Sequence, residues 1–257
     1  MNNTLIKGLG LLEVLARSDR ALGVTELAAR MGIGKSNVHR VLQALVELGY
    51  VRRDPAGSYA ASIRLWELGS AMLANLDLRR ASQAWMDWLL ERSRETVHLS
   101  VLDGDEVVYV HKVDSPEPVR AYSQIGGRAP AHCVATGKAM LAWQGEVALA
   151  ALSQRLRAWS PRTVTDPAEF LREMDRVRQV GYAINRGEWR ESVGGIAAPV
   201  RDPGARVIAA IGLSGPIERL RPAGLRLLAA EVIRAAEGVS ASLAGAPTAP
   251  PQTAEVR

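Results

Sequence analysis

Hydrophobic residues in the first sixty positions recur with the spacing of an α-helix in three successive segments. This pattern predicts helices over residues 5–16, 26–31 and 36–48. The apolar residues of the third helix share one side, which we expect to pack against the first two helices; they are Val38, Val41, Leu42, Leu45 and Leu48. The opposite side is polar, so the three segments predict a small helical core with one exposed polar face.

The ends of these helices carry residues that favour caps and turns. Thr25 and Ser36 have hydroxyl groups that can accept the free N–H groups at the start of the second and third helices. Gly49 is placed to end the third helix. A short turn with Gly32 and Gly34 joins the two helices, as in a DNA-binding helix-turn-helix. The next stretch, YVRRDPAGSYAAS, predicts two short strands around a Pro-Ala-Gly turn, and therefore a wing.

Side chains of the types that contact phosphates and base edges gather on the third helix and in the wing. They are Lys35, Ser36, Asn37, His39, Arg40 and Gln43 on the helix, and Arg52 and Arg53 in the wing. A merely solvated helical hairpin is the alternative. The charge favours the DNA hypothesis, because the net charge is +5 and residues 1–60 hold eight basic and five acidic residues.

The rest of the chain alternates between helical and extended patterns. Residues 62–78 form a broad apolar stripe at helical spacing, made of Ile63, Leu65, Trp66, Leu68, Met72, Leu73 and Leu76. Helices are also predicted over residues 79–94, 167–180 and 223–243, and strands over 96–114 (a hairpin), 118–125, 192–200 and 206–214. Hairpins mixed with helices predict an α+β domain. Residues 245–257 are Pro- and Ala-rich with little to bury, and we expect a disordered tail.

Enzymatic and metal chemistry find little support. Cys133, the one cysteine, follows His132, but neighbouring residues of a helix point about 100° apart and do not usually meet. No orienting Asn or Asp completes a nucleophilic site. The four histidines form no metal-ligand spacing. No apolar run approaches a membrane span, and one cysteine suits a reducing cytoplasm. We therefore expect a cytoplasmic protein that is not an enzyme and uses no cofactor.

Three stretches resemble one family when taken together. TELAARMGIGKSNVHRVLQALVELGYVRRD, GGRAPAHCVATGKAMLA and GGIAAPVRDPGARVIAAIGLSGP are similar to segments of the IclR family of bacterial transcription regulators, and occur in the same order. The resemblance covers about residues 5 to 243. It implies a winged helix-turn-helix at 1–61, a linker helix at 62–78 that contributes to dimer contacts, and a GAF-like α+β effector-binding domain at 79–244. The implied protein is a homodimer or tetramer on double-stranded promoter DNA.

The second of these stretches leads a glycine-rich loop into a helix, whose free N–H groups are suited to receive a carboxylate. The resemblance implies that a small organic acid binds there, on the N–H groups of Ala135 and Thr136. It places the remaining lining at Ala121, Ala129, Asn185, Gly195, Gly212 and Ser214. Two of these, Gly195 and Gly212, stand where some relatives have Cys and Ser. They predict a roomier cavity, with Trp189 as an aromatic wall, and favour a bulkier and aromatic acid.

Alternatives stay open both for the two glycines and for the whole chain. The glycines could instead serve close strand packing or a bulge. The whole chain could also be a metabolic enzyme with an appended DNA-binding module, or an architectural DNA binder without an effector. Turnover of a bound ligand would favour the enzyme, and sequence-independent binding would favour the architectural protein.

Overall fold

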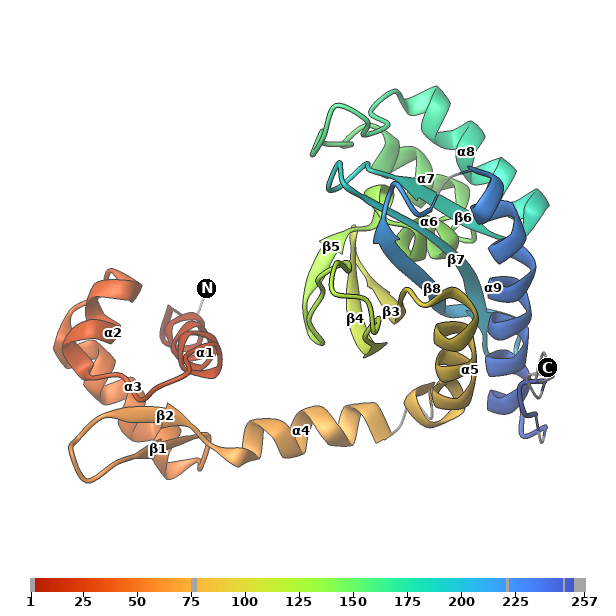
Figure 1. Ribbon diagram of the computed structural model, residues 1–257. Coiled ribbons are helices and arrows are strands. Elements are labelled where there is room, and N and C mark those ends of the chain that lie inside the picture. Colours follow the sequence, from red (N-terminus) through yellow and green to blue (C-terminus); the bar gives the residue numbers. More distant parts are fainter. Residues whose placement is uncertain (1–2, 75–77, 221, 247, 252–257) are drawn as a thin grey trace. The chain divides into compact units, whose positions relative to one another are not determined.

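The computed structural model describes residues 3–74, 78–220, 222–246 and 248–251. It divides into two compact units, residues 1–76 and 77–257. The apolar side chains of Met72 and Leu73, the whole of Leu76, and the expected disorder of residues 252–257 lie outside what is described. Figure 1 labels the elements of each unit.

The first unit is a three-helix core with a wing. Its elements are α1 (Asn3–Ala16), α2 (Val24–Met31), α3 (Lys35–Glu47), β1 (Val51–Arg53), β2 (Tyr59–Ala61) and α4 (Ile63–Ala74). The predicted apolar stripe of α3 is buried at Val38, Val41, Leu42 and Leu45. A bridge between Leu22 and Tyr59 ties the segment before α2 to the wing. This confirms the winged helix-turn-helix.

The helix ends differ from prediction in their caps. Neither Thr25 nor Ser36 is an N-cap, because α2 and α3 begin earlier, after the extended backbone of Gly23 and Gly34. Gly49 does end the third helix as predicted, with a φ of 77° and its N–H donated to the Val46 carbonyl. Leu48 is 57% exposed rather than buried. It lies one residue beyond α3, where the helical stripe no longer continues.

The second unit is built on a six-stranded antiparallel sheet with the order β5-β4-β3-β8-β7-β6. Its strands are β3 (Thr96–Asp103), β4 (Glu106–Val113), β5 (Arg128–Pro130), β6 (Ala183–Arg186), β7 (Val193–Arg201) and β8 (Val207–Pro216). The helices are α5 (Leu78–Ser93), α6 (Ala135–Leu141), α7 (Glu146–Ser153), α8 (Pro167–Val180) and α9 (Pro222–Leu243), with a short 3-10 turn, η1 (Ala131–Cys133). The predicted α+β class is confirmed.

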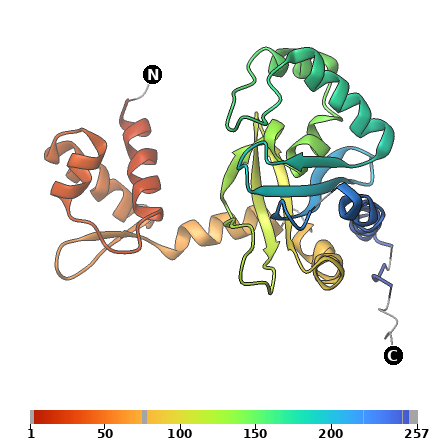
Figure 2. The same ribbon diagram turned by 45° about the horizontal axis from the view of Figure 1, so that its top comes forward.

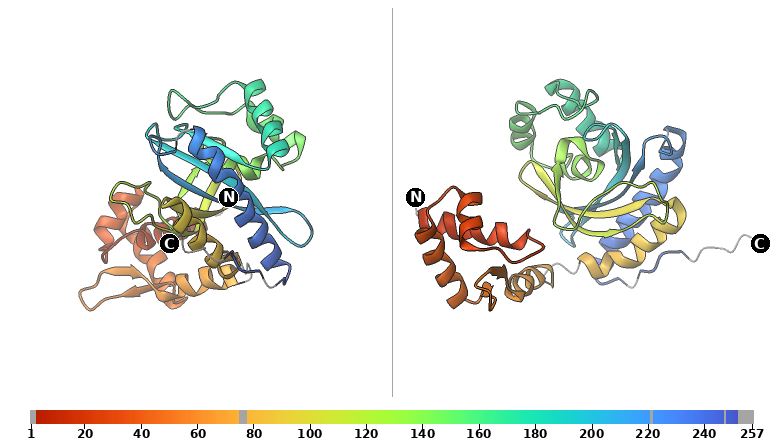
Figure 3. Two further views of the ribbon diagram at one scale, coloured as in Figure 1. Left: turned by 45° about the vertical axis from the view of Figure 1, so that its right-hand side comes forward. Right: turned by 60° about the vertical axis from the view of Figure 1, so that its left-hand side comes forward.

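Helices cover both faces of this sheet, as Figures 2 and 3 show. Helices α5 and α9 bury the aliphatic side chains of one face together with Trp85 and Trp88. Helices α6, α7 and α8 form a second core on the opposite face, around Phe170 and Met174. Alternation along β3 directs Val97 and Leu99 into the first core, so His98 between them faces the α6 side.

Most of the predicted elements of this unit are found. The N-cap of α8 is Asp166, whose side chain accepts the Glu169 N–H, and Gly181 ends the helix in the left-handed conformation. The strand expected over residues 118–125 was wrong, because this segment is a loop. The apolar residues Val119, Tyr122 and Ile125 are spaced by three and exposed, so they do not alternate as a strand face would. The edge of β4 pairs instead with β5.

Candidate functional site

The polar face of the first unit lies over α3 and the wing. Five of its six predicted side chains on α3 are exposed and Asn37 is half-buried; Arg52 and Arg53 are both exposed on β1. Arg40 donates to the Asn37 side-chain oxygen at 3.1 Å, which holds the guanidinium against the first turn of α3. A groove between helix and wing brings His39 and Gln43 next to Arg53. The arrangement offers donors and positive charge on one continuous surface.

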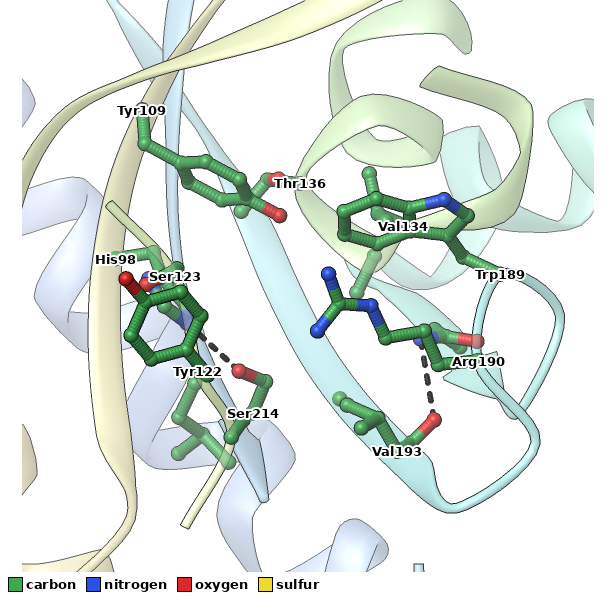
Figure 4. Close-up of a pocket in the computed structure, with 15 residues that line it drawn as sticks. His98, Tyr109, Tyr122, Ser123, Val134, Thr136, Trp189, Arg190, Val193 and Ser214 are labelled. Atoms are coloured by element: carbon green, nitrogen blue, oxygen red, sulfur yellow. Dashed lines mark hydrogen bonds between the residues drawn. The ribbon is translucent and has the colours of Figure 1, made fainter. Parts of the chain in front are cut away.

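A cavity lies in the second unit, where the start of α6 meets the sheet; the space between its walls is about 510 Å³ with the adjoining open solvent included. Its lining comes from β3, β4, β7, β8, the end of β6 and two loops, and Figure 4 shows the side chains. The aromatic part of the lining is Tyr109, Tyr122 and Trp189. Largely apolar walls with a few polar groups are typical of a small-molecule site.

The start of α6 supplies the first polar wall of this cavity. All seven residues of α6 are buried, and no described side chain caps its N-terminus. The Thr136 hydroxyl is buried without a hydrogen-bond partner among the described residues. Free N–H groups and an unpaired hydroxyl at one place favour an anionic or hydrogen-bonding ligand group.

The opposite wall holds a buried histidine between two serines. His98 Nε2 lies 2.6 Å from the Ser214 hydroxyl and Nδ1 lies 3.2 Å from the Ser123 hydroxyl. Burial, together with the charge of Lys112 and against the opposing charge of Asp114, lowers the pKa of His98 from 6.5 to about 4. The imidazole is therefore neutral at pH 7, with one ring nitrogen donating and the other accepting.

Arg190 brings a positive charge to the cavity. Its side chain is exposed and its guanidinium lies 4.5 Å from the Trp189 ring centroid. In Figure 4 the guanidinium points into the space between Thr136 and Ser214. Arg190 is a site residue that was not predicted from the sequence, although its position directly after Trp189 was a signal that could have indicated it. A stacked guanidinium in a half-enclosed space is well suited to a carboxylate.

The structure brings six of the eight predicted effector residues together, since Ala121, Ala135, Thr136, Asn185, Gly195 and Ser214 all line the cavity. Ala129 does not, because it is buried in the pairing of β4 with β5. Gly212 does not line it either, and the cavity space predicted from its missing side chain was wrong. A side chain there would overlap the Ala197 side chain and the Ile196 carbonyl oxygen, so the glycine serves close strand packing.

Asn185 has a structural task in addition to lining the cavity. Its side-chain oxygen accepts the N–H groups of Gly187 and Glu188 at 3.0 and 2.9 Å, and its amide donates to the Val193 carbonyl at 3.4 Å. These bonds shape the loop that carries Trp189 and Arg190. The side chain therefore positions the loop in addition to lining the cavity, and one of the two N–H groups of its amide donates to Val193.

His132 and Cys133 are not arranged for nucleophilic chemistry. His132 Nε2 lies 3.0 Å from the Arg157 carbonyl oxygen rather than at the thiol. Cys133 is fully buried, and burial raises the pKa of its thiol to about 12. A raised thiol pKa is the opposite of what a nucleophile needs. Among the residues that the structure describes, no group of His, Cys, Asp and Glu could hold a metal ion.

Known protein families match both units of the chain. The family model "IclR helix-turn-helix domain" matches residues 4–55, and "Bacterial transcriptional regulator IclR C-terminal" matches residues 70–241. The chain belongs to the IclR family. Like other IclR-type regulators, it binds DNA through its helix-turn-helix and carries an effector-binding C-terminal domain.

Relatives of this IclR-type chain are regulators rather than enzymes. It is 36% identical to the HTH-type transcriptional regulator KdgR of Escherichia coli over 94% of its own length and 92% of that protein. It is 31% identical to the transcriptional repressor IclR of the same organism, over 94% and 90% of the two chains. A crystal structure of an IclR homologue from Microbacterium hydrocarbonoxydans, complexed with 4-hydroxybenzoate, has a TM-score of 0.83 at 27% identity and covers 95% of this chain and 100% of that one. Within the described residues, none of the helices has the length and apolar character needed to span a membrane.

Proposed function

We propose that this IclR-type regulator binds promoter DNA through α3 and the wing, and that an aromatic carboxylate in the second unit controls this binding. In this proposal residues 1–61 bind DNA, 62–78 link, 79–244 respond to the effector, and 245–257 form a tail. The observation that carries the effector part is the cavity itself, where the cationic Arg190 and the free start of α6 lie among three aromatic side chains.

The carboxylate is expected at the N–H groups of Ala135 and Thr136, with Arg190 supplying the opposite charge. The aromatic ring would lie among Tyr109, Tyr122 and Trp189, where stacking adds to apolar burial. The 4-hydroxybenzoate complex of the Microbacterium homologue supports this class of ligand, since the two chains share the fold over nearly their full length. Gly212 packs against Ala197 and adds no space to the cavity, so the aromatic walls are what favour an aromatic acid.

Control of DNA binding requires that the effector bind two arrangements of the protein with different affinity. A helix-turn-helix commonly acts as a dimer on two half-sites about one helical turn apart. We therefore propose a homodimer or tetramer on a pseudo-palindromic promoter site. An architectural protein would bind DNA without sequence preference and without response to any acid. Equal affinity for specific and non-specific DNA, with no acid bound, would therefore indicate an architectural protein.

Calorimetry with benzoate, 4-hydroxybenzoate and aliphatic acids of two to six carbons tests the effector class. Arg190→Gln is expected to lower the affinity for aromatic acids roughly 10–100-fold, because the carboxylate loses a charged hydrogen-bond partner. Arg157→Gln, an exposed arginine elsewhere in the same unit, is the matched control and should bind like wild type. Preference for a two-carbon acid would contradict the aromatic class, and unchanged affinity in Arg190→Gln would contradict the site.

Gel-shift titrations test the DNA surface. If Arg40 contacts a base, Arg40→Ala is expected to weaken binding to the specific site by about 1–3 kcal/mol. Binding to non-specific DNA should change less. Arg52→Ala should weaken both kinds of DNA alike and lower the salt slope by about one, as loss of a phosphate contact does. Arg17→Ala removes an exposed charge outside the surface and is the control. If Arg40→Ala and Arg52→Ala both bind DNA as tightly as wild type and the Arg17→Ala control, α3 and the wing are not the DNA surface.

A further inference from the structure

A second hollow of the same unit lies away from the effector cavity, between α8, the turn that precedes it, and the end of β6. It has an open volume of about 1110 Å³. Four arginines from three separate segments line it, namely Arg162, Arg172, Arg176 and Arg186. We call this hollow the arginine groove. All four side chains are exposed, so their guanidinium groups are accessible from solvent.

These four guanidinium groups have no anionic partner within the described part of the chain. No ion pair joins any of them to a described carboxylate. Arg172 and Arg176 are four apart on α8 and therefore share one helical face, where like charges repel. The guanidinium of Arg162 lies close to Gly187, the residue that follows β6. A Cβ atom placed on this glycine would lie 3.2 Å from Arg162 Nη1.

Two of the three carboxylates that line the groove pair with a buried lysine instead. Lys138 is fully buried, and its ammonium donates to Glu173 at 2.9 Å and to the Ile184 carbonyl at 3.2 Å, and pairs with Glu188. Glu188 also accepts the Arg186 N–H at 3.2 Å. With Glu169 at the rim, the groove and Lys138 hold five cationic and three anionic groups. The excess of positive charge lies on the exposed arginines.

We propose that the arginine groove binds a metabolite carrying two or more oxyanion charges, either an organic phosphate or a polycarboxylate. Planar guanidinium groups form paired hydrogen bonds with phosphate and carboxylate oxygens, and several arginines around one hollow match several such groups. The volume exceeds what a single small ion fills. A monocarboxylate would leave most of the positive charge unpaired, which separates this ligand class from that of the effector cavity.

Occupancy of the groove bears on the effector cavity, because one loop serves both. Arg186 and Glu188 face the groove, and the next two residues, Trp189 and Arg190, line the effector cavity. A ligand held by Arg186 therefore fixes the base of the loop that carries the carboxylate-binding arginine.

Calorimetry on the full chain tests the groove with pyrophosphate, citrate and acetate at constant ionic strength. Pyrophosphate and citrate distinguish the two sources of oxyanions, and acetate is the singly charged probe. The test variant is Arg172→Gln with Arg176→Gln, because glutamine keeps the helix propensity of these exposed positions. The matched control, Arg80→Gln with Arg234→Gln, removes two exposed charges from α5 and α9 on the other face of the sheet. An Ala121→Phe variant fills the effector cavity and shows whether a probe binds there instead.

Saturable binding of pyrophosphate or citrate is expected, weakened roughly 10–100-fold in the Arg172/Arg176 variant and unchanged in the Arg80/Arg234 and Ala121→Phe variants. Acetate should not bind the groove. The proposal is overturned if neither multivalent anion binds, if both double variants lose affinity equally, or if Ala121→Phe alone abolishes binding. In that last case the effector-cavity proposal would still stand, so the two proposals fail separately.

Discussion

Thr136 offers a test in which stability and ligand binding should change in opposite directions. Its hydroxyl is buried at the start of α6 and has no hydrogen-bond partner among the described residues. A buried hydroxyl that has left water without a new partner costs about 1–3 kcal/mol of folding free energy. Thr136→Val replaces it with a methyl group of similar size. The unliganded variant should therefore gain about 1–2 kcal/mol of unfolding free energy.

The gain should appear as a higher melting temperature of the second unit. For a unit of this size, about 1 kcal/mol shifts the midpoint by roughly 2–4 °C, so a rise of about 2–8 °C is expected. Tryptophan fluorescence follows this unit well, because five of the six tryptophans lie after residue 77. The same variant should bind an aromatic acid roughly 10-fold more weakly, since the carboxylate loses a hydroxyl donor.

Thr96→Val is the matched control. Thr96 is also fully buried, but its hydroxyl oxygen accepts the Ser115 N–H at 3.3 Å. Removing this acceptor strands a buried N–H, so the control should melt at a lower temperature than wild type. If Thr136→Val is destabilised as the control is, with unchanged ligand affinity, then its hydroxyl is paired in the protein and the reasoning about the start of α6 is refuted.

Two further predictions concern buried ionisable side chains. The folded pKa of His98 is about 4 and the unfolded value about 6.5, so as the pH falls from 6.5 to 4 only the unfolded chain takes up this proton. Stability should fall over that window by up to about 3 kcal/mol, and chemical denaturation at several pH values should show a smaller loss in His98→Gln. An equal loss in both proteins would assign the acid sensitivity to other groups. Lys138→Met should cost about 3–5 kcal/mol because it leaves Glu188 buried without its cation, and the additional change Glu188→Gln should recover much of that loss in the same denaturation assay. A mild effect of Lys138→Met would show that Glu188 is already uncharged.

The elements that follow from local chemistry could be predicted well from the sequence. Asp166 caps α8 through a side chain three residues from its partner, and Gly49 ends the third helix through its own backbone freedom. Thr25 and Ser36 were wrong as caps, because the extended glycines Gly23 and Gly34 also start helices without offering a side chain. Local patterns could not decide between these two ways to begin a helix.

The candidate site depended on contacts that the sequence does not display. His98 meets Ser214 only because β3 pairs with β8, more than a hundred positions along the chain. The role of Gly212 depended on whether its missing side chain faced open space or Ala197, which strand register alone decides. Arg190 was missed because its loop is shaped by the side chain of Asn185, five positions earlier.

The close packing at Gly212 also indicates how such a regulator can acquire a new ligand. Because the sheet beneath the cavity leaves no space for a side chain there, changes at this position disturb the fold before they alter recognition. Two of the aromatic walls of the cavity, Tyr122 and Trp189, are instead single side chains on loops. Exchanging one of them resizes the cavity while the layers of the domain stay intact. At positions such as Tyr122 and Trp189, ligand preference can therefore drift during evolution without eroding the fold.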